Sequence, residues 1–240
     1  MKRFSLGVRQ GLRYTASGGR VPRVAGCEVA ESTVEVTLEQ LAAEIRVCPK
    51  CELARTRTHA VPGEGNPRAR IMFIGEAPGW HEDQQGRPFV GAAGKFLNEL
   101  LALAGLKREE VFITNVVKCR PPGNRDPLPD EIAACAPYLE RQIAAIDPEV
   151  IVTLGRFSMA RWFPGERISR IHGQPKRVDG RLIVPMYHPA AALHQSAFRA
   201  AIEEDFAKLP KILAEAERER VRHRDEAEQE EKPAQQMSLF

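Results

Sequence analysis

The sequence predicts a three-layer α/β/α protein in which a central four-stranded parallel sheet lies between helices. Short apolar runs alternate along the chain with longer segments whose apolar residues recur at helical spacing. The short runs are apolar at nearly every position, as expected for strands that are buried on both faces of a parallel sheet. The expected strands are residues 71–75, 111–117, 150–155 and 182–188.

Four further segments are expected to be helical. The first, TLEQLAAEIRVC, begins at Thr37, a residue type that favours the N-cap of a helix. Residues 92–105 end in a glycine, and residues 129–146 carry acidic side chains in their first turn. Residues from about 190 to 222 are expected to form one long helix. In such folds ligands bind at the carboxyl ends of the strands, so the residues that follow the strands are the first candidates for a site.

Length and composition exclude several classes of protein. The chain has 240 residues, of which 43% are hydrophobic and 28% are charged, which suits one globular domain with appendages and excludes wholesale disorder. No run approaches the roughly 18 apolar residues of a membrane span, and the N-terminus lacks the apolar region of a secretory signal. We therefore expect a cytoplasmic protein with no membrane partner. The net charge of +3 allows nucleic-acid binding without requiring it.

The ends of the chain differ from its middle. Residues 1–36 are interpreted as a flexible basic arm, because residues 1–24 contain six basic side chains and no acidic one. A start codon that has been placed too early is the alternative explanation. Residues 37–210 are expected to form the globular domain, and residues 211–235 the charged end of a helix and a linker.

Four of the five cysteines form two pairs whose spacing suits a metal centre. Cys48 and Cys51 make a C-x2-C pair, whereas Cys119 follows a strand and Cys135 lies on the next expected helix. Structural zinc more often uses two C-x2-C pairs, and one such pair with two separate thiolates suits an iron–sulfur cluster at least as well. Buried cysteines without a ligand role are the alternative. Cys27 lies in the N-terminal arm and is assigned no role.

The strand-end motifs, taken together with the cysteines, carry a specific resemblance. GEAPG (75–79) follows the first expected strand, GRPFVGAAG (86–94) comes next, TNVVKCRPPGNRDP (114–127) includes the end of the second, and HPAA (188–191) follows the fourth. Over residues 40–210 the chain resembles the family 4 uracil-DNA glycosylases, the iron–sulfur branch of the uracil-DNA glycosylase superfamily. The resemblance implies that superfamily's α/β fold. It also implies a monofunctional DNA repair hydrolase that flips uracil out of DNA and cleaves its N-glycosidic bond, leaving an abasic site for base excision repair.

The same resemblance assigns a [4Fe-4S] cluster to Cys48, Cys51, Cys119 and Cys135. It implies uracil-containing DNA as the partner, and we expect a monomer that is cytoplasmic and nucleoid-associated. A non-catalytic DNA-binding module that carries a cluster or zinc is the alternative from another functional class. The asparagine within the second strand and the histidine at the end of the fourth argue against it, because a protein that only binds DNA needs neither.

The uracil pocket implied by the resemblance is built from the strand-end motifs. Phe89 would stack on the flipped base. Asn115 would read uracil, because its amide can accept a hydrogen bond from N3–H and donate one to O4, an edge that cytosine reverses. His188 would donate to uracil O2 as negative charge develops on the departing base. The pocket would also be lined by Glu76, Ala77 and Pro78.

Some positions depart from the pattern of the wider superfamily. Relatives outside family 4 have an aspartate at the position of Ala77 that positions the attacking water, so Glu76 becomes the candidate for water activation here. Glu82 matches a position thought to crowd the C5 methyl of thymine. Ala191 and Ala192 stand where the family often has an aromatic residue and a leucine, which leaves Leu193 as the expected wedge into DNA.

A covalent cross-link to the abasic product, as in a sister branch of the superfamily, is not expected. That branch uses a histidine in the segment after the second strand, and the corresponding segment here, CRPPGNRDPLPDE, contains none. The RIH sequence at residues 170–172 lies outside it. The candidate catalytic residues are therefore Glu76, Asn115 and His188.

The last five residues form a separate motif. Gln236, Met237, Ser238, Leu239 and Phe240 resemble the Gln-Leu-Ser-Leu-Phe peptides with which bacterial replication and repair proteins bind the DNA polymerase sliding clamp. Residues 226–236 contain no large hydrophobic side chain, so the three apolar residues at the end would be costly to expose without a receptor. A C-terminus of random sequence is the alternative.

Overall fold

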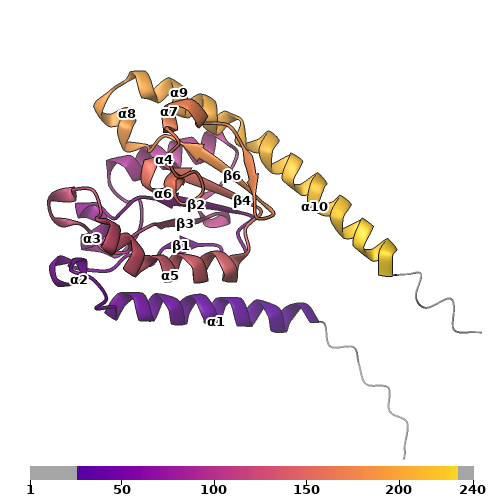
Figure 1. The fold of residues 1–240 in the computed structure, drawn as a ribbon, viewed down its shortest axis with the longest axis horizontal. Helices are drawn as coiled ribbons and strands as arrows, with labels where there is room; N and C mark the ends of the chain where they lie inside the picture. Colours follow the sequence, from indigo (N-terminus) through magenta and orange to yellow (C-terminus); the bar gives the residue numbers. More distant parts are fainter. Residues whose placement is uncertain (1–25, 232–240) are drawn as a thin grey trace, which may run out of the picture.

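The computed structural model describes residues 26–231, and within that range it contains a six-stranded sheet (Figure 1). The strands are ordered β1-β3-β2-β4-β6-β5. Their bounds are β1 Glu64–Gly65, β2 Ile71–Gly75, β3 Phe112–Asn115, β4 Val150–Leu154, β5 Lys176–Val178 and β6 Arg181–Met186. Most of the expected basic arm and the whole peptide of residues 236–240 lie outside the described residues.

The predicted central sheet is confirmed by the four inner strands, β3, β2, β4 and β6, which pair in parallel. The two edge strands were not predicted from the sequence, and each pairs antiparallel with its neighbour: β1 with β3 and β5 with β6. These edges are two and three residues long and only partly buried. Strands this short and exposed carry no run of apolar residues, which is the signal that reveals a buried strand.

Ten α-helices surround the sheet within the described range. Their bounds are α1 Gly26–Val47, α2 Leu53–Thr56, α3 Trp80–Gln85, α4 Ala92–Leu103, α5 Pro129–Ile146, α6 Arg156–Ala160, α7 Ile168–Ile171, α8 Ala190–His194, α9 Ala197–Ala207 and α10 Leu209–Glu231. Within that range, no helix is both long and apolar enough to cross a membrane.

Two helix predictions are wrong in their limits. Helix α1 begins at Gly26, so Thr37 lies inside the helix rather than at its N-cap. No glycine or proline occurs between Gly26 and Thr37, so nothing in that stretch forces a helix to start later. The single long helix expected over residues 190–222 is three helices, and Gln195, with φ −140° and ψ 113°, ends the first of them. Gln195 and Ser196 at the first break are neither glycine nor proline, so the helical spacing hid that break, whereas Pro210 in the first turn of α10 marks the second.

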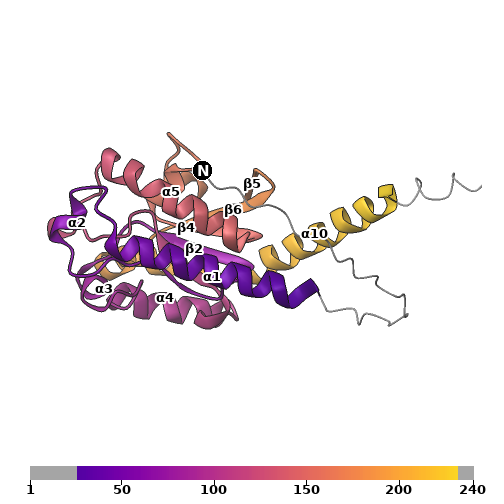
Figure 2. The same ribbon diagram turned by 90° about the horizontal axis from the view of Figure 1, so that it is seen from below.

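The inner strands build two cores because successive side chains point to opposite faces of the sheet. Met72 and Ile74 pack toward α1 and α5, whereas Ile71 and Phe73 pack toward α4, α9 and α10. Figures 1 and 2 show these two helical layers on either side of the sheet. The three-layer α/β/α architecture is confirmed.

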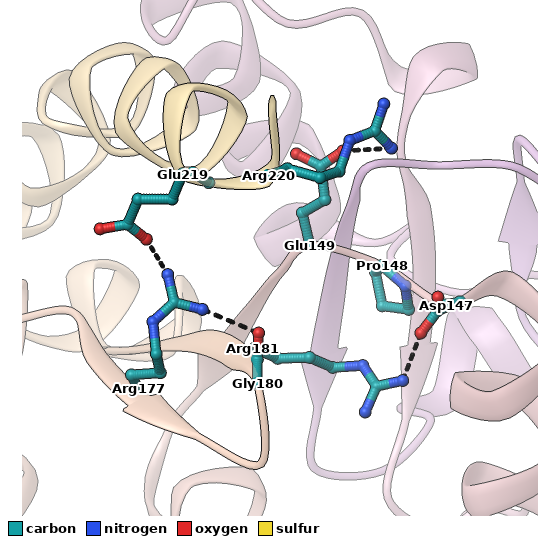
Figure 3. Close-up of a pocket in the computed structure, with 9 residues that line it drawn as sticks. Asp147, Pro148, Glu149, Arg177, Gly180, Arg181, Glu219 and Arg220 are labelled. Carbon is teal, nitrogen blue, oxygen red and sulfur yellow. Dashed lines mark hydrogen bonds and ion pairs between the residues drawn. The ribbon is translucent and has the colours of Figure 1, made fainter. Parts of the chain in front are cut away.

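The amino ends of the inner strands carry a cavity of about 240 Å³ beside α10 (Figure 3). The charged side chains that line it are all paired: Arg177 with Glu219, Arg181 with Asp147, and Arg220 with Glu149. Two of these pairs join α10 to the body of the protein, and the first turns of α10 bury Leu209 and Ile212 in the core. Beyond this attachment the helix projects away from the body, as Figures 1 and 2 show.

Candidate active site

A cavity of about 590 Å³ opens at the carboxyl ends of the strands, at the opposite end of the sheet from the charged cavity. The helices α3 and α8 lie at this end in Figure 1, away from the end where α10 projects. The structure brings together in this cavity all seven residues that the resemblance implied for a uracil pocket: Glu76, Ala77, Pro78, Glu82, Phe89, Asn115 and His188. They follow or end β2, β3 and β6, where a parallel sheet places its ligand sites.

Asn115 is the buried polar group at the base of this cavity. It is the last residue of β3, pairs in register with Gly75 of β2, and is 1% exposed. Its Oδ1 atom has no hydrogen-bond partner in the part of the chain that the structure describes. Because an unsatisfied buried oxygen costs free energy, this atom marks the place of a hydrogen-bond donor from outside the protein.

Gly75 allows the close approach of two other pocket residues. A Cβ atom at this position would lie 2.4 Å from Asn115 Oδ1 and 2.7 Å from Phe89 Cζ. Any larger residue would therefore displace both the amide and the aromatic ring. The glycine that follows the apolar run of β2 thus has a packing role inside the site.

Phe89 is held in a strained backbone conformation beside the cavity. Its φ angle is +50°, a region that L-residues other than Asn and Asp seldom adopt. Its ring lies 5.5 Å from the His188 ring, centroid to centroid, with 25° between the planes. Gly94 packs against its backbone, because a Cβ on Gly94 would lie 1.9 Å from the Phe89 carbonyl oxygen.

Glu82 fixes the loop that carries Phe89. The Glu82 Oε1 atom accepts hydrogen bonds from the backbone N–H groups of Val90 and Gly91, both at 2.9 Å. These are the residues directly before α4, so a carboxylate here also satisfies donors near the helix N-terminus. The structure therefore gives Glu82 a structural role as well as a place in the cavity wall.

His188 is set up as a neutral hydrogen-bond donor. The backbone N–H of Ala190 donates to His188 Nδ1 at 3.1 Å, so the neutral ring carries its proton on Nε2. Burial lowers the pKa of His188 to about 4, although the nearby Glu82 carboxylate acts in the opposite direction. At neutral pH the ring is uncharged, and its Nε2–H is free of the backbone.

Glu76 occupies the wall of the cavity next to an ion pair that the sequence analysis did not single out. Burial raises the pKa of the Glu76 carboxyl, the Asp126 charge adds to this effect, and Arg156 opposes it. Asp126 and Arg156 pair with each other at the rim. Within residues 26–231, the Glu76 carboxylate makes no hydrogen bond or ion pair of its own. A carboxylate with a raised pKa and no fixed partner suits a general base.

A second, smaller cavity is lined by the four cysteines that were predicted to form a metal centre. It lies between the α1–α2 connection, the segment after β3, and α5. The thiols of these cysteines are free of disulfides in the described chain. Arg57 donates to Cys119 Sγ at 3.1 Å, and the backbone N–H of Lys118 donates to Cys135 Sγ at 3.3 Å. Burial raises the pKa of Cys119 to about 11. Thiolates at this place would therefore need a positive centre to stabilise them.

The four thiols form a donor set of the kind that holds an iron–sulfur cluster. Among residues 26–231, no group of three or more His, Cys, Asp or Glu side chains is arranged to hold one metal ion. The four thiols nevertheless face one cavity, and an iron–sulfur cluster spaces its ligands more widely than one ion does. The cysteine chemistry and its convergence on one cavity are thus compatible with a cluster of the kind the sequence predicts.

Comparison with known proteins identifies the family. Residues 62–209 match the family model described as the uracil DNA glycosylase superfamily. The chain is 53% identical over 186 residues to the type-4 uracil-DNA glycosylase of Sulfurisphaera tokodaii, and the aligned stretch covers 73% of this chain and 84% of that protein. This chain belongs to the type-4 uracil-DNA glycosylases. The type-4 enzyme of Thermotoga maritima is 43% identical over 186 residues, covering 75% of this chain and 97% of that protein.

A more distant type of the superfamily is matched over a shorter stretch. The type-5 uracil-DNA glycosylase of Thermus thermophilus is 40% identical over 114 residues, which covers 41% of this chain and 52% of that protein. The superfamily match includes all seven predicted cavity residues and two of the cysteines, Cys119 and Cys135. Cys48 and Cys51 precede it, on the segment that joins α1 and α2.

Proposed function

We propose that this type-4 family member removes uracil from DNA by hydrolysing the N-glycosidic bond and leaves an abasic site. One observation carries the proposal: a buried asparagine whose side-chain oxygen lacks a partner within the described residues sits at the base of a cavity that also contains Phe89 and His188. The names of the type-4 relatives support the same activity. A base that reaches this cavity must leave the DNA stack, so the reaction includes base flipping.

The recognition step follows from the chemistry of the Asn115 amide. Uracil presents N3–H as a donor and O4 as an acceptor, which match Oδ1 and Nδ2 of Asn115 respectively. Cytosine presents an acceptor and a donor in the reverse order, so both contacts would fail. A site that leaves buried polar groups unpaired with the wrong base discriminates strongly against it. Phe89 provides the stacking surface for the ring of the flipped base.

The cleavage step depends on where negative charge develops. As the glycosidic bond breaks, the sugar becomes electron-poor and the departing uracil becomes anionic. The Nε2–H of His188 donates to uracil O2, and a preorganised donor of this kind acts most strongly in the transition state. Because the pKa of His188 is lowered to about 4, the ring performs this role as a neutral imidazole.

The attacking water requires a base, and Ala77 cannot supply one. We assign this role to Glu76, whose carboxylate lies in the cavity wall with a raised pKa. Glu82 also lines the cavity, and we propose that it excludes the C5 methyl of thymine while it holds the loop of Phe89. Leu193, which is 50% exposed on α8, is the proposed wedge into the DNA.

We propose that the enzyme is monofunctional and acts as a monomer. His172, the histidine of the RIH sequence, does not line the cavity. Its Nδ1 lies 2.6 Å from Asp205 Oδ2, and its ring packs on Tyr187. It is therefore engaged outside the cavity in the described structure, and a covalent bond between it and the abasic product is not part of the proposed reaction.

We propose that Cys48, Cys51, Cys119 and Cys135 hold a [4Fe-4S] cluster. When bound, such a cluster supplies a structural crosslink between the α1–α2 segment, the segment after β3, and α5, and it has the capacity for electron transfer. Protein purified anaerobically should be brown and contain four irons per chain by this assignment. Stoichiometric zinc without iron would contradict it.

A labelled oligonucleotide tests the proposed reaction. A single uracil is placed in a synthetic strand, the protein is added, and alkali then cleaves any abasic site before the products are separated on a gel. Cleavage at uracil and at no cytosine or thymine is expected. The outcome against the proposal is binding of the DNA without cleavage, which would favour the non-catalytic binding module.

We further propose that the enzyme is recruited to the bacterial sliding clamp by residues 236–240. The support is the sequence of the peptide and the direction of α10, which carries the chain away from the body before the described part ends (Figure 1). Tethering by a modest peptide affinity would raise the local concentration of the enzyme at replicating DNA. Calorimetric titration with the clamp should show binding by the full chain and none after deletion of residues 236–240.

The same truncation provides the control for that experiment. Uracil excision from short oligonucleotides should be unchanged, because the peptide is remote from the cavity in sequence and follows a projecting helix. If the truncated protein binds the clamp as tightly as the full chain, recruitment by this peptide is wrong.

A further inference from the structure

Lys118 is a buried lysine to which neither the proposed reaction nor the proposed cluster assigns a task. It is 1% exposed and is among the largest fully buried side chains of the described structure. In residues 26–231, no carboxylate forms an ion pair with it. Burying an ammonium group without a counter-charge is costly unless each of its N–H groups finds an acceptor.

Three neutral oxygens accept from the Lys118 Nζ atom. They are Thr114 Oγ1 at 2.6 Å, the Asn115 carbonyl oxygen at 2.7 Å, and Gln142 Oε1 at 2.7 Å. The Thr114 hydroxyl and the Gln142 amide both donate to the carbonyl oxygen of Pro62, at 3.0 Å and 2.7 Å, so each turns an acceptor oxygen to Lys118. An ammonium group has three donors, and all three are used.

A small polar network, here called the Lys118 network, is formed by five residues: Lys118, Thr114, Asn115, Gln142 and Pro62. It joins the carboxyl end of β3 to α5 and to the segment before β1. A fully satisfied buried network of this kind fixes the geometry of the groups that belong to it. The element fixed most directly is the backbone of Asn115.

The backbone of Asn115 needs support of this kind because the Asn115 side chain has little support of its own. Its Oδ1 has no hydrogen-bond partner among the described residues, and the nearby Gly75 offers only close packing. The direction of the amide is therefore set by the backbone that carries it. Lys118 bonds the carbonyl of that same residue at the point where the β2–β3 pairing ends.

The segment of Lys118 also connects the uracil cavity to the cysteine cavity. The backbone N–H of Val117 donates to the Glu76 carbonyl at 3.1 Å, and that of Lys118 donates to Cys135 Sγ at 3.3 Å. Cys119 follows directly. Residues 115–119 thus run from the base-reading amide at one end to a proposed cluster ligand at the other.

We propose that Lys118 is a positioning residue for uracil recognition, which holds the Asn115 backbone so that its amide meets the edge of the flipped base. The inference rests on the proposed role of Asn115 as the reader of uracil. Lys118 itself touches neither the base nor the reacting atoms.

The test replaces Lys118 by methionine, which keeps the length of the side chain and removes the three donors. We expect Lys118→Met to lower single-turnover excision of uracil by roughly 10- to 100-fold, as for the loss of hydrogen bonds to a charged group. Inhibition by free uracil should weaken in parallel, because recognition and not only catalysis is disturbed. The matched control is Lys211→Met, at an exposed lysine on α10 that lines neither the uracil cavity nor the cysteine cavity, which should leave both quantities unchanged.

Iron content, visible absorption and melting temperature are measured on every variant, and rates are compared per iron-loaded, folded chain. Gln142→Met provides a second route that leaves the cysteine segment intact, and it should give a smaller loss in the same direction. If Lys118→Met, or Gln142→Met where the former does not fold, excises uracil at the parent rate, the inference is overturned.

A double-mutant cycle separates positioning from general damage. In an Asn115→Ala background the Lys118 network has no amide left to position, so Lys118→Met should cause no further loss of the residual rate. A further loss of the same factor in both backgrounds would mean that Lys118 acts independently of Asn115 and would overturn the inference.

If Asn115→Ala alone leaves excision intact, the proposed reading role falls and this inference falls with it. If Asn115→Ala abolishes discrimination while Lys118→Met does not, only the inference about Lys118 falls.

Discussion

The cavities at the two ends of the sheet are both lined by polar and charged side chains, yet they are built in opposite ways. At the amino ends, each charged side chain in the lining has an ion-pair partner, as Arg177 has in Glu219. At the carboxyl ends, Asn115 Oδ1 and the Glu76 carboxylate have no partner within the described residues. Folding therefore pairs every charged group in the amino-end lining, whereas it leaves these two groups of the carboxyl-end lining available to an incoming ligand.

Unpaired polar groups of this kind indicate where a ligand binds in a fold of this type. A paired charge contributes to the attachment of an element, here α10, and gains little from a ligand. An unpaired group that is buried at some cost can be repaid only by what binds there.

Asn115→Asp should produce the largest loss of activity. The new carboxylate presents two acceptors to an edge of uracil that offers one donor and one acceptor, and the mismatch is buried. We expect a fall of roughly 1,000-fold or more in single-turnover excision, since a site that leaves a buried polar contact unmade discriminates strongly. The single-turnover rate is measured by quenched-flow or manual sampling with a uracil oligonucleotide. Asn98→Asp, the same change on the exposed face of α4, is the control and should have no effect.

The melting temperature distinguishes recognition from folding in that experiment. If Asn115→Asp lowers melting temperature and activity together, and the remaining folded fraction is fully active, then Asn115 is a structural residue and the comparison of the two cavities loses its main support.

His188→Ala should cause the next largest loss. Removal of one donor to a developing anion typically costs roughly 100- to 1,000-fold in rate, and we expect the lower part of that range. The affinity for uracil-containing DNA should change much less, because the hydrogen bond strengthens as charge develops. Rate and affinity are measured separately by single-turnover kinetics and by equilibrium binding to an uncleavable analogue. An unchanged rate would remove His188 from the mechanism.

These two residues also show what the sequence could and could not reveal. Asn115 stands out because an amide within an apolar strand requires a partner, and His188 because it follows a strand in a motif. Their convergence could be predicted, since parallel strands end at the same edge of a sheet. The dual role of Glu82 could not be predicted, because its bonds to Val90 and Gly91 depend on how a loop folds back.

Features that depend on three-dimensional pairing were missed for the same reason. The edge strands β1 and β5 carry no apolar run, and Lys118 is a lysine in a loop motif with no sign in sequence that it is buried. The paired charges around α10 look like any solvated helix face in sequence. Local patterns thus revealed the inner strands and the groups that end them, whereas partners distant in the chain became visible only in the fold.

The pH dependence of excision should come from Glu76 and not from His188. A general base works when it is ionised, so the rate should fall as the pH drops through the raised pKa of Glu76. His188 stays neutral until the pH approaches about 4, so it contributes no change between pH 5 and pH 8. Below the pKa of Glu76 the fall should be roughly tenfold per pH unit.

Glu76→Gln checks this assignment. The variant should be slower at neutral pH, and its rate should no longer fall on the acid side, because the ionisation responsible has been removed. Iron content is measured at each pH to exclude loss of the proposed cluster. An acid limb that persists unchanged in Glu76→Gln would assign the ionisation to another group and would contradict the role of Glu76 as the base.

The smallest effect is expected at the amino-end cavity, where Arg177→Met breaks the pair with Glu219. Both side chains are more than a third exposed, so the pair should contribute less than about 1 kcal/mol to stability. The free energy of unfolding, measured by denaturant titration at low salt, should fall by no more than this, and the difference should shrink as salt screens the charges. Uracil excision should be unchanged, because α10 is attached at the end of the sheet away from the base. A loss of excision comparable to that of His188→Ala would show that the two cavities are coupled, and the division between a satisfied and an unsatisfied end of the sheet would then be wrong.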